Sequence, residues 1–222
     1  MLLTRFLRNV LTGQAPGPKD FAPSSLPKVV CVGGTEQFQM MPAHYIGWHR
    51  ELLSEQRVPE ASIVQSLFDL ERLQGSSYDA VFFAHRLKNY PLHDAARILS
   101  GFRHLLRPGG FVHIVVPDLM GLVRHMLENK KDLEDSAYAS PAGPISYHDV
   151  LFGRQSPSAG AATRSFEPHL CGYSTKVLKR VLFDSGFIDS YVFERPEHFE
   201  IHAFAGQDAI QDRFKLIMGL KP

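Results

Sequence analysis

Mostly apolar runs alternate along this chain with segments in which apolar residues recur every three or four positions. The runs at 28–33, 78–84 and 111–116 each have the length of a buried strand. Between the last two, residues 92–106 place leucine, alanine and phenylalanine side chains on one stripe of a helix. Strand, helix and strand in this order form a βαβ unit, which predicts a parallel sheet with helices on its faces.

The rest of the pattern predicts more elements of the same kind. Strands are expected at 50–53, 62–65, 188–194 and 199–205, and helices at 119–128, 147–152 and 175–185. Asp118 and Ser174 stand at N-cap positions, and Gly186 follows the last helix as its stop. The short connection around Pro196 makes the last two strands antiparallel, which predicts a reversed strand at the edge of the sheet. We therefore expect an α/β, Rossmann-like fold with a doubly wound, seven-stranded, mostly parallel sheet and an antiparallel last strand.

Four segments differ in character. Residues 1–27 combine an amphipathic helical pattern with a linker rich in Gly, Pro and Ser. The helix packs on the domain, docks a protein partner or acts as a targeting segment, and these interpretations stay open. The domain itself is expected over 28–206, with a loop-rich lid or insert at about 130–172, and 207–222 is either a helix or a loose tail.

Composition and charge narrow the class of protein. The net charge of the 222 residues is +1, which favours no nucleic-acid or anionic-membrane surface. The two cysteines, Cys31 and Cys171, lie far apart without metal-ligand spacing, which is typical of a reduced, cytoplasmic compartment. No apolar run has the length of a membrane span, and no cluster of His and Cys predicts a metal site.

Several short motifs resemble one family in their order and spacing. Arg107–Gly110 resembles the turn before strand five of the class I S-adenosylmethionine (SAM)-dependent methyltransferases, and Ser77–Val81 resembles their entry into strand four. A subgroup of small methyltransferases, similar to methyltransferase type 11, shares three further features with this chain. These are Pro117–Leu119, Ser140–Ile145 followed by Asp149, and His169 before Gly172-Tyr173-Ser174.

The resemblance implies that SAM is the cofactor and assigns residues to it. The expected contacts are Gly33, Gly34, Thr35, Glu51, Glu55, Asp69, Leu70 and Ala84. The glycines would let the backbone approach the cofactor, an acid after strand two would accept the ribose hydroxyls, and Asp69 would accept the adenine amino group. The chain departs from the family pattern at Thr35, where a further glycine is usual, and at Cys31, where an acidic or polar residue is usual. Ser54 or Gln56 is an alternative to the two glutamates.

The same resemblance suggests where chemistry takes place. The catalytic candidates are His169, Asp149 and His85, with Asp149 and His169 as an oriented acid–base pair. The candidates for substrate binding are Asp118, His148 and Tyr173. Lys88 and Asn89 stand where the subgroup typically carries Glu-His, and an asparagine cannot take a proton at neutral pH.

Three functions remain open at this point. The first is a SAM-dependent methyltransferase acting on an unidentified acceptor, a small molecule or saccharide-type metabolite. The second is a catalytically degenerate methyltransferase fold that acts as a binding or scaffold partner. The third is another nucleotide-binding Rossmann protein, although the full Gly-x-Gly-x-x-Gly of a dinucleotide enzyme is missing.

Overall fold

The computed structural model describes most of the domain. The described residues are 29–32, 44–47, 61–63, 66–140, 143–153 and 168–210. The strands are β1 (Val29–Val32), β2 (His44–Gly47), β3 (Ala61–Ile63), β4 (Tyr78–Ala84), β5 (Leu106–Pro117), β6 (Ser136–Ser140), β7 (Gly143–Ser146), β8 (Asp189–Arg195) and β9 (Glu200–Gly206). The helices are η3 (Leu67–Arg72), η4 (Leu87–Asn89), α3 (Leu92–Leu105), α4 (Leu119–Glu128), α5 (Tyr147–Phe152), α6 (Thr175–Asp184) and η5 (Pro196–His198), where η marks a 3-10 helix.

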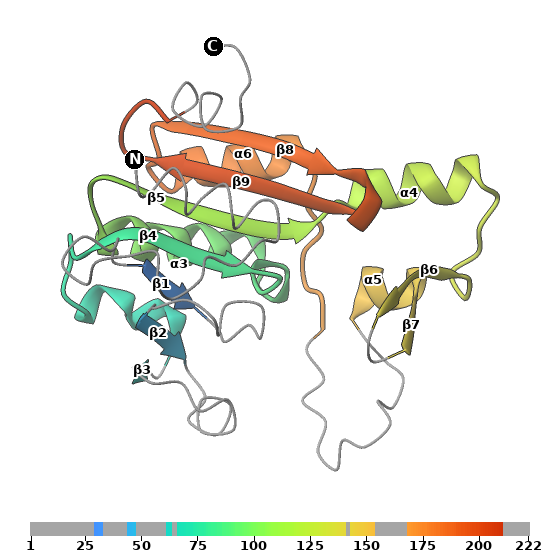
Figure 1. Cartoon of the computed structure of the whole chain (residues 1–222), viewed down its shortest axis with the longest axis horizontal. Coiled ribbons are helices and arrows are strands. Elements are labelled where there is room, and N and C mark those ends of the chain that lie inside the picture. Colours follow the sequence, from blue (N-terminus) through green and yellow to red (C-terminus); the bar gives the residue numbers. More distant parts are fainter. Residues whose placement is uncertain are drawn as a thin grey trace, which may run out of the picture.

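The main sheet is mixed, with the strand order β3-β2-β1-β4-β5-β9-β8 (Figure 1). The pairs from β3 to β5 are parallel, whereas β9 runs antiparallel to both β5 and β8. The last strand is thus antiparallel, as predicted, but its expected place at the edge was wrong. It lies between β5 and β8, because each of its two sides finds a long partner there, and β8 forms the edge.

The second strand was also misplaced. The prediction put it at 50–53, which lies outside the described residues, whereas β2 pairs with β1 through Cys31 and Tyr45. A short strand of this kind is selected by its neighbours in the sheet rather than by its own composition.

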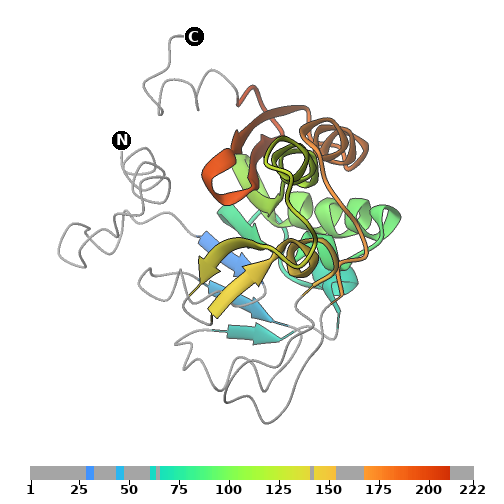
Figure 2. The same ribbon diagram turned by 90° about the vertical axis from the view of Figure 1, so that its right-hand side faces the viewer.

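The main core lies between the sheet and the helices α3, α6 and η3, which cover the same face (Figure 2). Alternate residues of β4 and β5, among them Phe83 and Ile114, point into this layer and are fully buried. Phe83 meets Phe102 of α3 edge to face, with ring centroids 5.0 Å apart. The predicted stripe of α3 is therefore confirmed as its buried face. A doubly wound fold carries helices on both faces of its sheet. Among the described residues, the helices α3, α6 and η3 confirm the helical layer on one of these faces.

The opposite face carries a second, smaller core. Val29, Ala80, Phe111 and Phe204 are buried there together with Ile210, which follows the last strand. The backbone around Ile210 is held by side chains of the sheet and by a neighbouring turn. Gly109, at φ +75°, donates its N–H to the Asp208 carboxylate at 2.9 Å, and the N–H of Ile210 donates to Asp189 at 2.7 Å. The first residues of the expected tail, 207–210, thus belong to the domain, and 211–222 lie outside the described residues.

A small unit lies beyond the carboxyl ends of the parallel strands. The strands β6 and β7 form an antiparallel hairpin that leads directly into α5, and both views place this unit off the sheet at that end (Figures 1 and 2). The sequence predicted α5 with its correct bounds but treated the hairpin as loop. The segment was expected to act as a lid, and this role stays a prediction.

The expected N-terminal amphipathic helix lies outside the described residues. Within the described part of the chain, no helix combines the length and the apolar character needed to cross a membrane.

Candidate functional site

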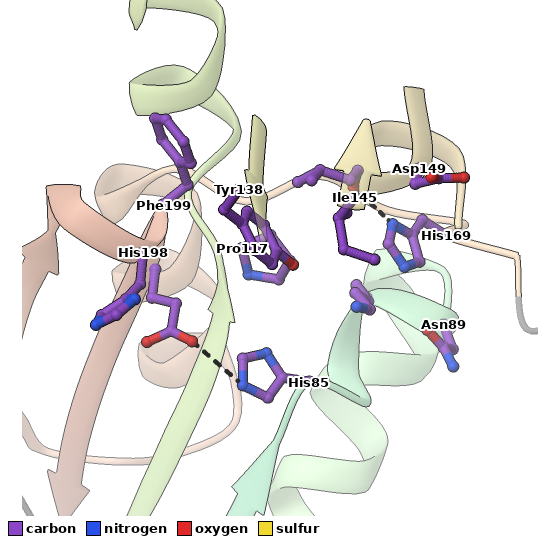
Figure 3. A pocket seen from close by; sticks show the side chains of 12 residues that line it. His85, Asn89, Pro117, Tyr138, Ile145, Asp149, His169, His198 and Phe199 are labelled. Carbon is purple, nitrogen blue, oxygen red and sulfur yellow. Dashed lines mark hydrogen bonds and ion pairs between the residues drawn. The ribbon is translucent and has the colours of Figure 1, made fainter. Parts of the chain in front are cut away.

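A cavity of about 320 Å³ lies at the carboxyl ends of β4 and β5, beside the start of β9. Ligands of open parallel sheets bind at this edge, and the volume suits a small organic molecule. Figure 3 shows His198 on one side, His169 and Asn89 on the other, and His85 between them. The lining residues are His85, Lys88, Asn89, Pro117, Tyr138, Ile145, Asp149, Val150, His169, His198, Phe199 and Glu200.

His85 is held at the end of β4 in an unusual backbone conformation. Its φ is +55°, which residues other than glycine rarely adopt. Its N–H donates to the Val115 carbonyl at 2.8 Å. Its Nε2 lies 3.4 Å from an oxygen of Glu200, as the dashed line in Figure 3 marks. Burial lowers the pKa of His85 to about 4, although the Glu200 charge opposes that shift. The imidazole is therefore neutral at pH 7, and donation of its Nε2 proton to Glu200 leaves Nδ1 as a proton acceptor.

Glu200 is also bonded to a pair of buried histidines. Its second oxygen lies 3.1 Å from Nε2 of His202, and Nδ1 of His202 lies 3.1 Å from Nε2 of His113. His113 is stacked on Phe204 with ring centroids 4.1 Å apart. Burial, together with the His202 charge, lowers the pKa of His113 well below its ordinary value. If His113 donates to His202 and His202 donates to Glu200, each of these two contacts joins one donor to one acceptor.

The carboxylate of Glu200 stays ionised in this network. Partial burial raises its pKa, but the hydrogen bond from His202 and the charge of His85 outweigh that effect and lower it overall. Sequence reasoning missed Glu200, His202 and His113. A signal was present, because Glu200, His202 and Phe204 alternate along β9 and so share one face, on which a buried polar pair is unusual. The partner on β5 could not be found without the register of the two strands.

On the other side of the cavity, the expected pair of Asp149 and His169 is not formed. Nδ1 of His169 lies 2.8 Å from the Val150 carbonyl. The Asp149 carboxylate accepts the N–H of Ser146 at 3.3 Å, which completes a capping box at the start of α5. The prediction of an oriented pair was wrong because the cap of a short helix holds this carboxylate. Both residues nevertheless line the cavity.

Lys88 links the cavity to the chain segment that carries His169. Its carbonyl accepts the N–H groups of Leu170 at 2.8 Å and Cys171 at 3.0 Å. Burial and the neighbouring Arg86 lower the pKa of its ammonium group to about 8. Burial and the Lys88 charge in turn lower the pKa of His169 to about 4. His169 is therefore neutral at pH 7, like His85.

Three residues predicted to bind ligands are structural instead. Leu70 is fully buried in the main core beneath α3. Tyr173 is 1% exposed, and its hydroxyl donates to the Leu87 carbonyl at 3.5 Å. His148 packs against Phe152, with ring centroids 5.0 Å apart, and does not line either cavity of this region. Each was assigned by its place in a motif, which does not reveal the direction of a side chain.

Asp118 lies next to the cavity but is almost fully buried. It occupies the N-cap position of α4, as predicted, yet its side chain makes no capping hydrogen bond. Its Oδ1 has no hydrogen-bond partner, and burial raises the pKa of the carboxyl. Its neighbour Pro117, rather than Asp118 itself, faces the cavity.

The expected cofactor residues lie mostly outside the described residues. This holds for Gly33, Gly34, Thr35, Glu51 and Glu55. Ala84 is buried at the end of β4, immediately before His85. Asp69 lies in the first turn of η3, with its carboxylate 3.5 Å from Arg72. The described residues bring no group of three His, Cys, Asp or Glu side chains into position for a metal ion.

Comparison with known proteins places this geometry in a known fold. No protein-family model and no curated protein matches the chain. Among solved structures, a SAM-dependent methyltransferase from Thermotoga maritima aligns with a TM-score of 0.55 at 15% identity, over 93% of this chain and 92% of that one. A SAM-dependent methyltransferase from Clostridium acetobutylicum aligns with a TM-score of 0.53 at 10% identity, over 81% of this chain and 83% of that one.

The chain has the fold of the SAM-dependent methyltransferases. The methyltransferase domain of citrinin polyketide synthase is a third example, with a TM-score of 0.55 at 11% identity over 93% of this chain and 52% of that one. The structural alignments establish the fold, whereas identities of 10–15% carry no information on activity, which depends on the site.

Proposed function

We propose that the chain is a SAM-dependent methyltransferase acting on a small-molecule acceptor. The observation that carries this proposal is the cavity at the carboxyl ends of β4 and β5, in a sheet whose reversed strand β9 contributes Glu200 to the lining. The proteins of similar fold named above are SAM-dependent methyltransferases.

Under this proposal, the cofactor lies along the strand ends on the β1 side. Gly33, Gly34 and Thr35 follow β1, and Glu51, Glu55 and Asp69 remain the proposed polar contacts. Ala84 would form the floor because a side chain of its size leaves room above β4. The cofactor supplies a methyl group on a positively charged sulfur.

The chain's own residues position the acceptor and remove its proton. Methyl transfer would form a bond from the acceptor atom to the methyl carbon, and the sulfur would keep the electron pair of the bond that breaks. The acceptor's proton passes to Nδ1 of His85, whose other nitrogen is held by Glu200. His113 and His202 fix the carboxylate that orients this base. Much of the rate would come from proximity and from exclusion of water by the β6–β7–α5 unit.

Calorimetric titration of the full chain with SAM and with S-adenosylhomocysteine tests this function. We expect both to bind in the micromolar to submillimolar range, since enzymes commonly have KM values of about 1 μM to 1 mM. Asp69→Ala should weaken binding by roughly tenfold or more, as expected when a hydrogen bond to a carboxylate is lost. Absence of heat at millimolar ligand would overturn the enzyme reading and leave a binding or scaffold role.

A further inference from the structure

A second, smaller cavity adjoins the site and differs from it in character. It has a volume of about 190 Å³ and lies between the start of α4, the end of α5 and the chain at 169–172. Apart from Lys88, His169 and Cys171, its lining is apolar or glycine, and no Asp or Glu lines it. The lining residues are Lys88, Pro117, Leu119, Val150, Leu151, Phe152, His169, Leu170, Cys171 and Gly172.

Lys88 is the charged group that both cavities share. Within the described part of the chain, no carboxylate lies within ion-pair distance of its ammonium group. The two carboxylates of the larger cavity are already engaged, Asp149 by the N–H of Ser146 and Glu200 by two histidines. A half-buried ammonium without a counter-ion is unfavourable, and an anionic ligand would relieve that cost.

We infer that the smaller cavity binds the apolar part of an acidic acceptor, whose carboxylate pairs with Lys88. This inference rests on the proposed function, because it identifies the substrate class of the same site. A monocarboxylate suits the cavity better than a phosphate, since the lining offers a single fixed cation and few other donors. A sugar suits it less, since its hydroxyls would face leucine, valine and phenylalanine side chains.

The position of Lys88 also orients such an acid. Lys88, His85 and His169 all line the larger cavity, and Lys88 and His169 also line the smaller one. A ligand anchored at Lys88 can therefore extend into the larger cavity, where a hydroxyl or amino group would meet His85.

Binding of benzoate to the full chain tests this inference. Benzoate carries one carboxylate on a small apolar ring, and benzamide is its neutral counterpart. We expect measurable benzoate binding by calorimetry and a loss of roughly tenfold to a hundredfold in Lys88→Met, as is typical when a hydrogen bond to a charged group is removed. Lys179→Met, an exposed position on α6, is the matched control and should bind like the wild type. Lys88→Arg keeps the charge and should bind more tightly than Lys88→Met.

A second measurement keeps the inference testable if Lys88→Met fails to fold. Benzoate should raise the pKa of His169, because the bound anion offsets the Lys88 charge, and NMR titration of the histidine ring reports this shift. Equal affinity for benzoate and benzamide, or an unchanged His169 pKa, would overturn the inference. Inorganic phosphate binding more tightly than benzoate would also overturn it. Neither experiment requires SAM. A failure of the chain to bind SAM can therefore be distinguished from a failure to bind benzoate at Lys88.

Discussion

Three histidines with lowered pKa values make the stability of this protein depend on pH. The pKa values of His85, His113 and His169 are all lowered, chiefly by burial. In the unfolded chain a histidine titrates near pH 6.5, so between about pH 6.5 and 4 the unfolded state binds more protons than the folded state. The free energy of unfolding should therefore decrease as the pH is lowered from about 6.5 to 4. Above this range, the three histidines no longer affect its pH dependence.

Replacement of His113 by phenylalanine tests this at one residue. The ring lies between Phe82 and Phe204, so His113→Phe keeps an aromatic contact and removes one titrating group. One group contributes a slope of at most about 1.4 kcal/mol per pH unit, and the variant should lose that part of the slope. Urea unfolding between pH 7 and 4.5 measures it. His93→Phe, at a side chain that is 80% exposed, is the control, and a His113→Phe curve parallel to the wild type would contradict the prediction.

Among the elements, helices were predicted better than short strands. The bounds of α4 and α5 agree with the prediction, because the periodic pattern and the cap residues act within one segment of chain. For β2 and the β6–β7 hairpin, pairing with another segment decides whether a strand forms, and no local pattern specifies that partner. The two predicted N-caps have different outcomes. The Ser174 side chain accepts a hydrogen bond from the first turn of α6, whereas the buried side chain of Asp118 makes no capping hydrogen bond to α4.

The cap of α6 gives a prediction at this scale. The Ser174 hydroxyl accepts the N–H of Val177 at 3.3 Å. Ser174→Ala leaves that donor without a side-chain acceptor and should lower the free energy of unfolding by about 1 kcal/mol. Ser174→Thr retains an acceptor oxygen and serves as the control. Denaturant titration distinguishes the two, and equal stability of the alanine variant and the wild type would show that the cap contributes nothing.

For the whole molecule, the second core defines where the domain ends. Ile210 is 3% exposed and packs against the sheet face that carries Phe111 and Phe204, although the domain was expected to end at residue 206. The segment 207–210 therefore completes the second core through the packing of Ile210. This packing is a property of the assembled sheet, since β5, β8 and the tail contribute to it together.

Ile210→Ala tests that packing. Removal of a buried isoleucine side chain typically costs about 2–4 kcal/mol, through the lost burial and the cavity left behind. Ile188→Ala is the matched control, because Ile188 is 75% exposed, and it should change stability by less than about 0.5 kcal/mol. Thermal and urea unfolding report both. Similar effects of the two substitutions would place Ile210 outside the core.

The sequence by itself determined the α/β class, the βαβ unit from β4 to β5, most helix bounds and the edge of the sheet at which the larger cavity lies. These follow from periodicity and capping, which act over a few consecutive residues. Only the tertiary structure decided which side chains meet there. It put Glu200 beside His85, placed His113 behind His202 and engaged the Asp149 carboxylate in the capping box of α5. Such contacts join residues as far as 115 positions apart, as in the contact between His85 and Glu200, and depend on strand register, which a pattern along one chain does not contain.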